Sequence, residues 1–254
     1  MMASIRFIEL LGAGIESIGA ETLQSLGIAR RSYDGSLKAL NEKSDKTILI
    51  IRHSERYSSE GVFQLTPKGV RMAQNFGKSI HMMYPDSKLS LYHAPATRCM
   101  MTAQYISEGH DPKNKDHITL MTSLDLGILN RTRYDELRKD YTPFKGYEGN
   151  YKFIEFNKRW VSGDFRDALI DSKQYANKIF AKMLKLEADN DRSTAIFVGH
   201  DTTLYPLIGH IFGIDRICTI NYLEGLSFIF NKETVQVRFR DLKRSIKTEE
   251  LIIE

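Results

Sequence analysis

A histidine between two arginines follows an apolar stretch of this sequence. The four apolar residues from Ile48 to Ile51 are typical of a buried strand, and Arg52, His53 and, three residues later, Arg56 come directly after them. Cationic neighbours disfavour protonation of an imidazole. A neutral imidazole can act as a nucleophile, and arginines bind anions through paired hydrogen bonds. The pattern therefore indicates a nucleophilic histidine in an anion-binding site.

Two more clusters carry side chains of the same kind. The segment HAPATR ends at Arg98, and the apolar run TAIFVG leads directly into His200 and Asp201. A third arginine adds to the anion-binding capacity, and a second histidine can donate a hydrogen bond to developing negative charge. Asp201 could supply a proton, but its place at the start of a helix also fits a simple N-cap.

The elements that must position these clusters alternate between strands and helices. Short apolar runs predict four strands, at 47–51, 88–93, 117–124 and 194–199. Helices are predicted from Pro67, with Thr66 as the N-cap, from Pro95 to Gly109, and from His200 onward. This alternation predicts an α/β fold with a mostly parallel sheet and helices on both faces, plus an inserted, mainly helical region at about 125–190. The three clusters then share the carboxyl edge of one sheet, where ligands bind in such folds.

Composition restricts the protein's environment and partners. Of the 254 residues, 42% are hydrophobic and 27% charged, and the net charge is only +4, which suits small anions better than nucleic acid. The two cysteines, Cys99 and Cys218, make no disulfide framework, so we expect a reducing, cytoplasmic location. The basic run RDLKRSIK near the C-terminus is predicted to be a solvated tail, and GLSFIFNKETVQVRFRDL a pair of hairpin strands.

The N-terminal residues 1–46 are predicted to form a helical arm ahead of the main domain. Glu9, Glu16 and Glu21 interrupt their apolar character, so neither a signal peptide nor a membrane span is expected. Apolar residues at helical spacing could pack on the chain's own domain or dock on a second subunit as a homodimer.

Four motifs in order resemble the histidine phosphatase superfamily, the group with the phosphoglycerate mutase-like fold. They are RHSER, LTPKGVRMAQNFG, HAPATRCMMTAQYI and VGHDTTLYPLIGHIFG, and the resemblance extends from about residue 47 to 242. It assigns residues 47–254 to a histidine phosphatase-like domain. Arg56 and Asp201 are most similar to the acid phosphatase branch, because the mutase-like branch usually has Gly or Ala after the second histidine and draws its acid from a mid-chain Glu. Ser54 departs from the family's glycine, and its hydroxyl could itself bind phosphate.

The resemblance implies a metal-independent phosphatase, with no cofactor, that hydrolyses phosphate monoesters through phosphohistidine. His53 is then the nucleophile, and Arg52, Arg56 and Arg98 bind the phosphoryl group. The further catalytic residues are His200, best if protonated, and Asp201 as general acid, with Glu55 and Asp125 as the next candidates. The substrate would be a phosphorylated small molecule or phosphoprotein, selected by the inserted region. A phosphomutase and a non-catalytic phosphate-binding or scaffold protein are the alternatives.

Overall fold

One mixed sheet runs through the computed structural model, which describes residues 46–57, 63–83, 89–111, 117–120, 128–141, 147–188, 194–231 and 233–247. The strand order is β3-β2-β4-β1-β5-β6-β7. The strands are β1 (Lys46–Arg52), β2 (Leu89–His93), β3 (His117–Leu120), β4 (Thr194–Gly199), β5 (Gly225–Phe230), β6 (Thr234–Phe239) and β7 (Leu242–Lys247). The predicted α/β fold is thereby confirmed.

The direction of the strands decides where their ends lie. The four strands β3, β2, β4 and β1 are parallel to one another, whereas β5, β6 and β7 continue from β1 as an antiparallel meander. In register, Arg52 of β1 lies opposite Gly199 of β4, and His93 of β2 lies opposite Val198 of the same strand. The carboxyl ends of β1, β4 and β2 therefore meet at one edge.

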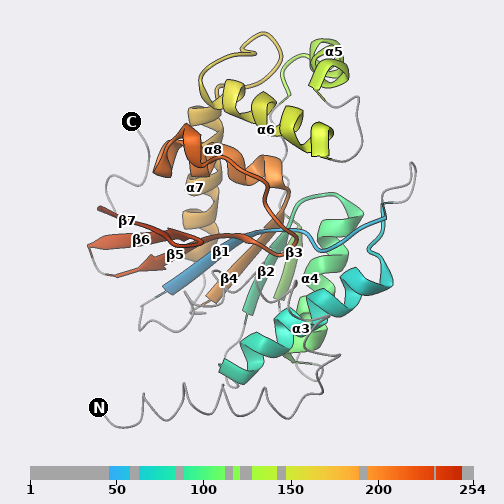
Figure 1. Ribbon diagram of the computed structural model, residues 1–254. Helices are drawn as coiled ribbons and strands as arrows, with labels where there is room; N and C mark the ends of the chain where they lie inside the picture. Colours follow the sequence, from blue (N-terminus) through green and yellow to red (C-terminus); the bar gives the residue numbers. More distant parts are fainter. Residues whose placement is uncertain are drawn as a thin grey trace.

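Helices cover both faces of the sheet, as predicted (Figure 1). They are α3 (Pro67–Met83), α4 (Thr97–His110), α5 (Arg131–Tyr141), α6 (Tyr147–Val161), α7 (Ser172–Ala188) and α8 (Asp201–Phe212), with a 3₁₀ turn η2 at Ile214–Arg216. Helices α3 and α4 lie on one face, α7 and α8 on the other, and α5 and α6 lie beyond α8. Three of the helices, α5, α6 and α7, make up the predicted inserted region.

Local sequence explains how the first helices form and pack. Thr66 caps α3, since its Oγ1 accepts the backbone N–H of Gly69 at 2.9 Å, and Pro67 is the first helical residue. Helices α3 and α4 approach closely at Gly77 and Gly109, where an added Cβ would lie 2.0 Å from a carbonyl oxygen of the other helix. Helix α4 begins at Thr97, two residues later than predicted, so Arg98 lies in its first turn.

The core is built on the strands that carry the site. Ile48 to Ile51 are fully buried and all residues of β4 are buried, because helices cover both sides of these parallel strands. On the α7 side, Phe180 contacts Phe228 of β5 with ring centroids 5.2 Å apart. The buried β1 and β4 fix the backbone from which Arg52 and His200 extend.

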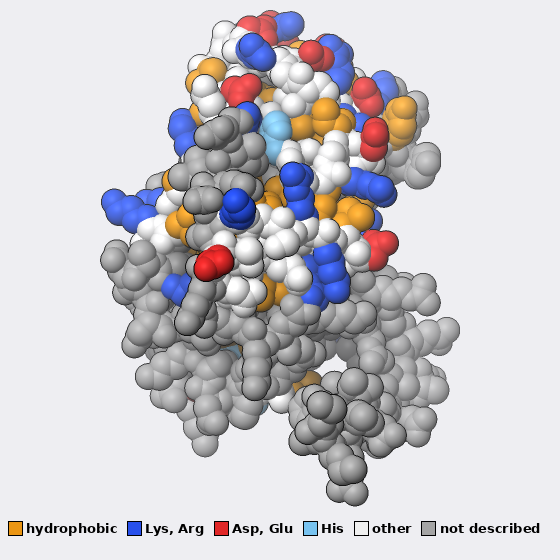
Figure 2. All heavy atoms as spheres, turned by 90° about the vertical axis from the view of Figure 1, so that its left-hand side faces the viewer, with side chains coloured by type: hydrophobic (Ala, Val, Ile, Leu, Met, Phe, Trp, Pro, Cys, Tyr) orange, Lys and Arg blue, Asp and Glu red, His pale blue; other side chains and the backbone are white. Residues whose placement is uncertain are grey.

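The predicted solvated tail is wrong in part, because Leu242–Lys247 forms strand β7 on the outer side of β6. Lys243 and Arg244 are two successive exposed residues, so the sequence of this strand lacks the regular alternation of apolar and polar residues that identifies a strand. Charged side chains on an edge strand discourage pairing with other chains. Figure 2 faces this side of the molecule and shows Lys and Arg side chains scattered over it rather than gathered into a stripe.

Other predictions fall outside the described residues. The N-terminal arm is one of them, apart from Lys46, which begins β1, and Asp125 is another. Among the helices that the structure describes, none has the length and apolar character needed to cross a membrane.

Candidate active site

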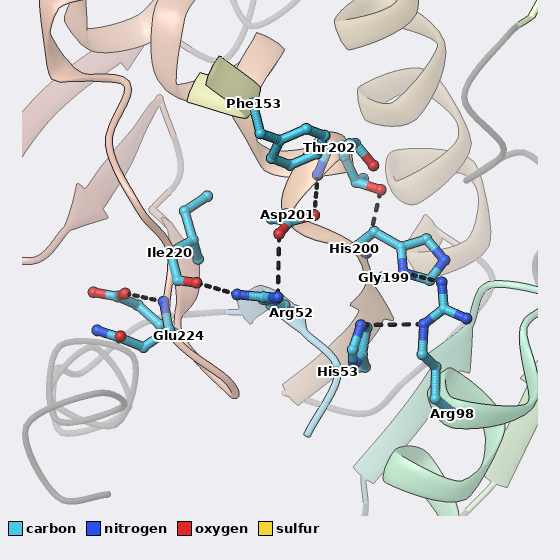
Figure 3. A network of polar contacts seen from close by, with 12 residues as sticks. Arg52, His53, Arg98, Phe153, Gly199, His200, Asp201, Thr202, Ile220 and Glu224 are labelled. Carbon is cyan, nitrogen blue, oxygen red and sulfur yellow. Dashed lines mark hydrogen bonds and ion pairs between the residues drawn. The ribbon is translucent and has the colours of Figure 1, made fainter. Parts of the chain in front are cut away.

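The three predicted clusters converge at the carboxyl edge of the sheet (Figure 3). The backbone N–H of His53 donates to the carbonyl of Gly199 at 2.9 Å, which ties the loop after β1 to the end of β4. Arg98 reaches the same place from the first turn of α4. Residues 52, 98 and 200, far apart in sequence, thus lie around one centre.

His53 is buried and held in one tautomer. Its Nδ1 lies 2.7 Å from the carbonyl oxygen of Ser54, and its Nε2 lies 3.2 Å from Nε of Arg98. A guanidinium can only donate, so Nε2 of His53 is the acceptor and carries the lone pair. Nδ1 then carries the proton and donates it to the carbonyl. The nitrogen that faces Arg98 is therefore the one free to act as a nucleophile.

Arg98 links the two histidines. Its Nη2 lies 3.4 Å from Nδ1 of His200, and the two imidazole rings lie 5.4 Å apart, edge to face. By the same donor argument, Nδ1 of His200 accepts and Nε2 carries its proton. Figure 3 shows the Arg98 guanidinium beside both rings. The Arg98 guanidinium and the imidazoles of His53 and His200 thus place their hydrogen-bonding nitrogens around one centre.

Arg52 faces Asp201 on the other side of this centre. Nη2 of Arg52 lies 3.3 Å from Oδ2 of Asp201, and Nη1 donates to the carbonyl of Ile220. Nε of Arg52 is buried without an acceptor among the described residues. Nε and Nη2 form one edge of the guanidinium, so an anion bound there would satisfy Nε and lie beside Asp201.

Asp201 is the first residue of α8, and the N-cap is His200, so the predicted N-cap role for Asp201 is wrong. Its Oδ1 accepts the N–H of Thr202 at 2.9 Å, while Oδ2 faces Arg52. A carboxylate in the first turn still favours the helix electrostatically.

Arg56 makes less contact with the site than its predicted role requires. It is exposed, and Nη1 donates to the carbonyl of Tyr57 at 2.8 Å. Among the contacts described for the site, none joins Arg56 directly to the histidines. Its charge nevertheless helps to lower the pKa of both Arg98 and His200, after the larger effect of burial. Arg56 therefore lies near the rim of the site.

Glu55, an alternative acid, is engaged elsewhere. Its carboxylate accepts hydrogen bonds from Oγ1 of Thr66 at 2.9 Å and from Nζ of Lys68 at 2.7 Å. Burial raises the pKa of Glu55, but these hydrogen bonds and the Lys68 charge outweigh burial and lower it overall. These contacts favour the ionised form, so Glu55 is poorly suited to donate a proton.

Ser54 fits the loop in which the family has glycine. Its backbone has no positive φ, so glycine's conformational freedom is not needed there. The side chain is fully buried, and Oγ donates to the carbonyl of Gly69 at 2.7 Å. The backbone N–H donates to Oγ1 of Thr102 at 3.0 Å. The hydroxyl therefore joins this loop to α3, rather than standing free for phosphate as the sequence suggested.

Burial and nearby positive charge lower the pKa values of His53 and His200, which favours the neutral form of both histidines. Burial is the largest cause that lowers the pKa of His53 well below its usual value, and Arg52, His200 and Arg98 add to it. Burial and then Arg98 lower the pKa of His200 to about 4. Protonation of His200 in the transition state stays a prediction. Neutrality suits a nucleophile at position 53, whereas protonation of His200 requires a bound anion.

These lowered pKa values predict acid-sensitive folding. In the unfolded chain His200 regains a pKa near 6.5, so the unfolded state binds more protons between pH 6.5 and 4, and stability falls as pH falls through that window. Between pH 7.5 and pH 4.5, the free energy of unfolding should fall by about 2 kcal/mol less in His200→Asn than in wild type. Urea denaturation at both pH values measures this. His81→Asn, at an exposed histidine, should behave like wild type; equal losses in all three proteins would contradict the argument.

Several contributors could not be found from sequence. The ring of Tyr222 lies 4.6 Å from Cζ of Arg52 and 5.9 Å from the His53 ring. Tyr222 belongs to a turn with no motif or spacing to mark it, and it reaches the site only through the pairing of β5 with β1. Cys99, directly after Arg98, is buried with its Sγ 3.8 Å from His200, and burial raises the pKa of its thiol to about 12. The Cys99 thiol thus packs against the site without being reactive.

Within the described residues, no group of three or more His, Cys, Asp or Glu side chains could hold a metal ion. The guanidinium groups of Arg52 and Arg98 supply positive charge at the centre. The arrangement can therefore bind a small anion with arginine side chains and present an imidazole nitrogen to it.

Comparison with solved structures supports the fold. A phosphoglycerate mutase from Bacillus anthracis str. Sterne has a TM-score of 0.50 and 16% identity, covering 82% of this chain and 95% of that one. A phytase from Citrobacter braakii has a TM-score of 0.51 and 11% identity, covering 77% of this chain and 85% of that one. At such identities the likeness concerns the fold alone. No curated protein sequence matches the chain.

Residues 48–219 match the family described as "Histidine phosphatase superfamily (branch 1)". The match begins within β1 and includes Arg52, His53, Arg98 and His200. It does not specifically confirm the predicted closeness to the acid phosphatase branch, which stays a prediction. Because the match covers well over half of the sequence, this chain belongs to the histidine phosphatase superfamily.

Proposed function

We propose that this protein hydrolyses phosphate monoesters through a phosphohistidine formed on Nε2 of His53. The observation that carries the proposal is the setting of this imidazole: Nδ1 is held by the carbonyl of Ser54, while Nε2 faces the guanidinium of Arg98. An imidazole fixed at one nitrogen presents the other as a nucleophile in a defined direction. An arginine beside that nitrogen is suited to draw a phosphoryl group toward it.

The arginines would bind the phosphoryl oxygens. Arg98 can exchange its contacts with the two histidines for contacts with the anion, and the Nε–Nη2 edge of Arg52 offers a second pair of donors. Arg56 would add its charge from the rim. The anion would raise the pKa of His200 and so favour its protonated form, which then stabilises the transition state. These charges replace the metal ions on which other phosphoryl-transfer enzymes rely, so activity is expected to survive a chelator.

Asp201 is the proposed general acid. Its carboxyl lies beside the edge of Arg52 to which we assign the phosphate, where the leaving oxygen can reach it. The negative charge of a bound phosphoryl group favours the protonated form of a neighbouring carboxyl. After the alcohol departs, the same group in its ionised form can activate the water that hydrolyses phosphohistidine.

Arg98→Ala tests the phosphate-binding role. Loss of this guanidinium should weaken inhibition by vanadate or inorganic phosphate by about 2–5 kcal/mol, because the bound anion loses its partly buried cationic partner. Folding stability should change little, since no acidic partner of Arg98 is left unpaired. Arg71→Ala, at an exposed arginine of α3, is the matched control. An inhibition constant that is the same in Arg98→Ala and wild type would refute the role.

A phosphomutase is the second candidate, since a phosphoglycerate mutase is among the proteins of similar fold. A mutase returns the phosphoryl group from histidine to a bound substrate, whereas a phosphatase passes it to water. A panel of phosphorylated metabolites and phosphopeptides, with and without chelator, should release inorganic phosphate if the proposal is right. Isomerisation that depends on a diphosphorylated primer, without phosphate release, would establish the mutase. Tungstate binding without any turnover would indicate a phosphate-binding scaffold.

The inserted region is proposed to select the substrate. Phe153 of α6 lies beside Asp201 and Thr202 (Figure 3), and its ring centroid is 6.0 Å from that of Tyr205 in α8. Helix α6 therefore brings an aromatic side chain close to the proposed acid. This placement supports recognition of the substrate's leaving group by α6, for either a phosphorylated small molecule or a phosphoprotein.

A further inference from the structure

Arg52 is held by a turn that the proposed chemistry does not use. The carbonyl of Ile220 accepts from Nη1 of Arg52, and the ring of Tyr222 lies 4.6 Å from its Cζ. The backbone of Arg52 is bound by the same turn, since its N–H donates to the carbonyl of Glu224 at 2.9 Å and its carbonyl accepts from Leu223 at 3.1 Å. Residues 220–224 thus grip Arg52 at both its backbone and its side chain.

An ion pair between the buried Glu224 and the exposed Arg240 holds this turn in place. Glu224 is only 5% exposed, and its carboxylate accepts from Nε and Nη2 of Arg240 at 2.5 and 2.8 Å. The same carboxylate accepts the N–H of Asn221 at 2.7 Å, and Nη2 of Arg240 also donates to the carbonyl of Thr219 at 2.7 Å. Arg240, which follows β6, therefore joins both ends of the segment that grips Arg52 (Figure 3 shows Glu224 on the far side of Arg52 from His53).

The backbone around this pair is strained in a way that needs such support. Leu223 has φ 62° and Arg240 has φ 55°, and neither is a glycine. Left-handed conformations cost non-glycine residues free energy and persist only where surrounding contacts impose them. The bidentate pair of Glu224 and Arg240 and its backbone contacts impose these conformations where the turn meets Arg52.

We propose that Glu224 and Arg240 are positioning residues, which act through the 220–224 turn to fix the guanidinium of Arg52 for phosphoryl binding. The inference rests on the proposed function, because it assumes that Arg52 binds the phosphoryl group. Asp201 cannot fix Arg52 throughout the reaction, since its carboxyl changes charge as it gives up and regains a proton. The Ile220 carbonyl and the Tyr222 ring keep the same charge at every step, so they can hold Arg52 constantly.

A double-mutant cycle tests the proposal through tungstate binding to the full-length protein. Arg240→Met should weaken tungstate binding about 10-fold in the wild-type background. In the Arg52→Ala background the same change should have no further effect, because the residue through which it acts is gone. A purely structural role predicts the same weakening in both backgrounds, and that result would overturn the inference. Wild type that binds no tungstate would instead overturn the proposed phosphate site.

Two further variants keep the test decisive. Arg244→Met is the matched control, since Arg244 also donates to a backbone carbonyl, that of Ile211, but at the C-terminal end of α8. It should leave tungstate affinity unchanged. If Arg240→Met does not fold, Glu224→Gln provides a milder change that removes the charge and keeps an acceptor. If Glu224→Gln and Arg240→Met both fold and bind tungstate as tightly as wild type, the proposal is refuted.

Discussion

His53→Ala is expected to abolish both turnover and covalent labelling by phosphate. The protein denatured in alkali with labelled substrate should retain phosphate that is stable to alkali and labile to acid, as a phosphoramidate is. Without the imidazole, no nucleophile remains at the end of β1, and the rate should fall by roughly 10⁶-fold, as when other covalent nucleophiles are removed. Persistence of the label in His53→Ala would refute the assignment.

His93 offers an unusually close control for this experiment. It ends the strand β2, is buried, and has its Nδ1 2.9 Å from the carbonyl of the next residue, Ala94, just as His53 does with Ser54. No arginine contact to its Nε2 is found among the described residues. His93→Ala should therefore keep the label, so that the two variants separate loss of the nucleophile from loss of a strand-end histidine.

The sequence contained enough information to bring the main site together. Fully apolar runs such as Ile48 to Ile51 can only be covered on both faces, which implies parallel central strands and a common carboxyl edge. Because Arg52, His53 and His200 directly follow such runs, their convergence follows from topology. Arg98 lies at the site as predicted although α4 begins two residues late, because either start leaves it in the first turn.

What could not be predicted depends on contacts between distant parts of the chain. The grip of the 220–224 turn on Arg52 depends on the pairing of β5 with β1 and on Arg240, none of which produces a local pattern. The pKa of His200 is lowered by its burial and by Arg98, and neither effect can be predicted from residue type or spacing. Strand β7 was missed because its exposed lysine and arginine residues hide the alternation of a strand.

The choice of general acid separates the two branches of the family in chemical terms. The acid phosphatase-like prediction places the acid at Asp201, whereas the mutase-like branch usually draws its acid from a mid-chain Glu. Beside Glu55, Asp125 is the next candidate in this chain. Asp125 lies outside the described residues, so only Asp201 can be argued from geometry. The Thr202 N–H and Arg52 both donate to its carboxyl, and both can donate to the amide oxygen of an asparagine in its place.

Asp201→Asn is therefore expected to fold normally and to lose its rate selectively. A general acid helps only when the departing oxygen would otherwise leave as an unstable alkoxide, so alkyl phosphates depend on it far more than p-nitrophenyl phosphate. The selective loss should approach 10²–10⁴-fold, roughly the contribution of general acid catalysis. The comparison should use the rate of phosphoenzyme formation, because Asp201 also serves in the later hydrolysis of phosphohistidine.

The pattern of losses identifies the acid. An equal loss on alkyl and aryl esters in Asp201→Asn would point to displacement of the neighbouring His200 rather than to a missing proton donor. No loss on either ester would exclude Asp201, and Asp125→Asn should then show the selective loss instead. If Asp201→Asn shows it and Asp125→Asn does not, the proton comes from the carboxyl beside Arg52, as the acid phosphatase-like His-Asp pair implies.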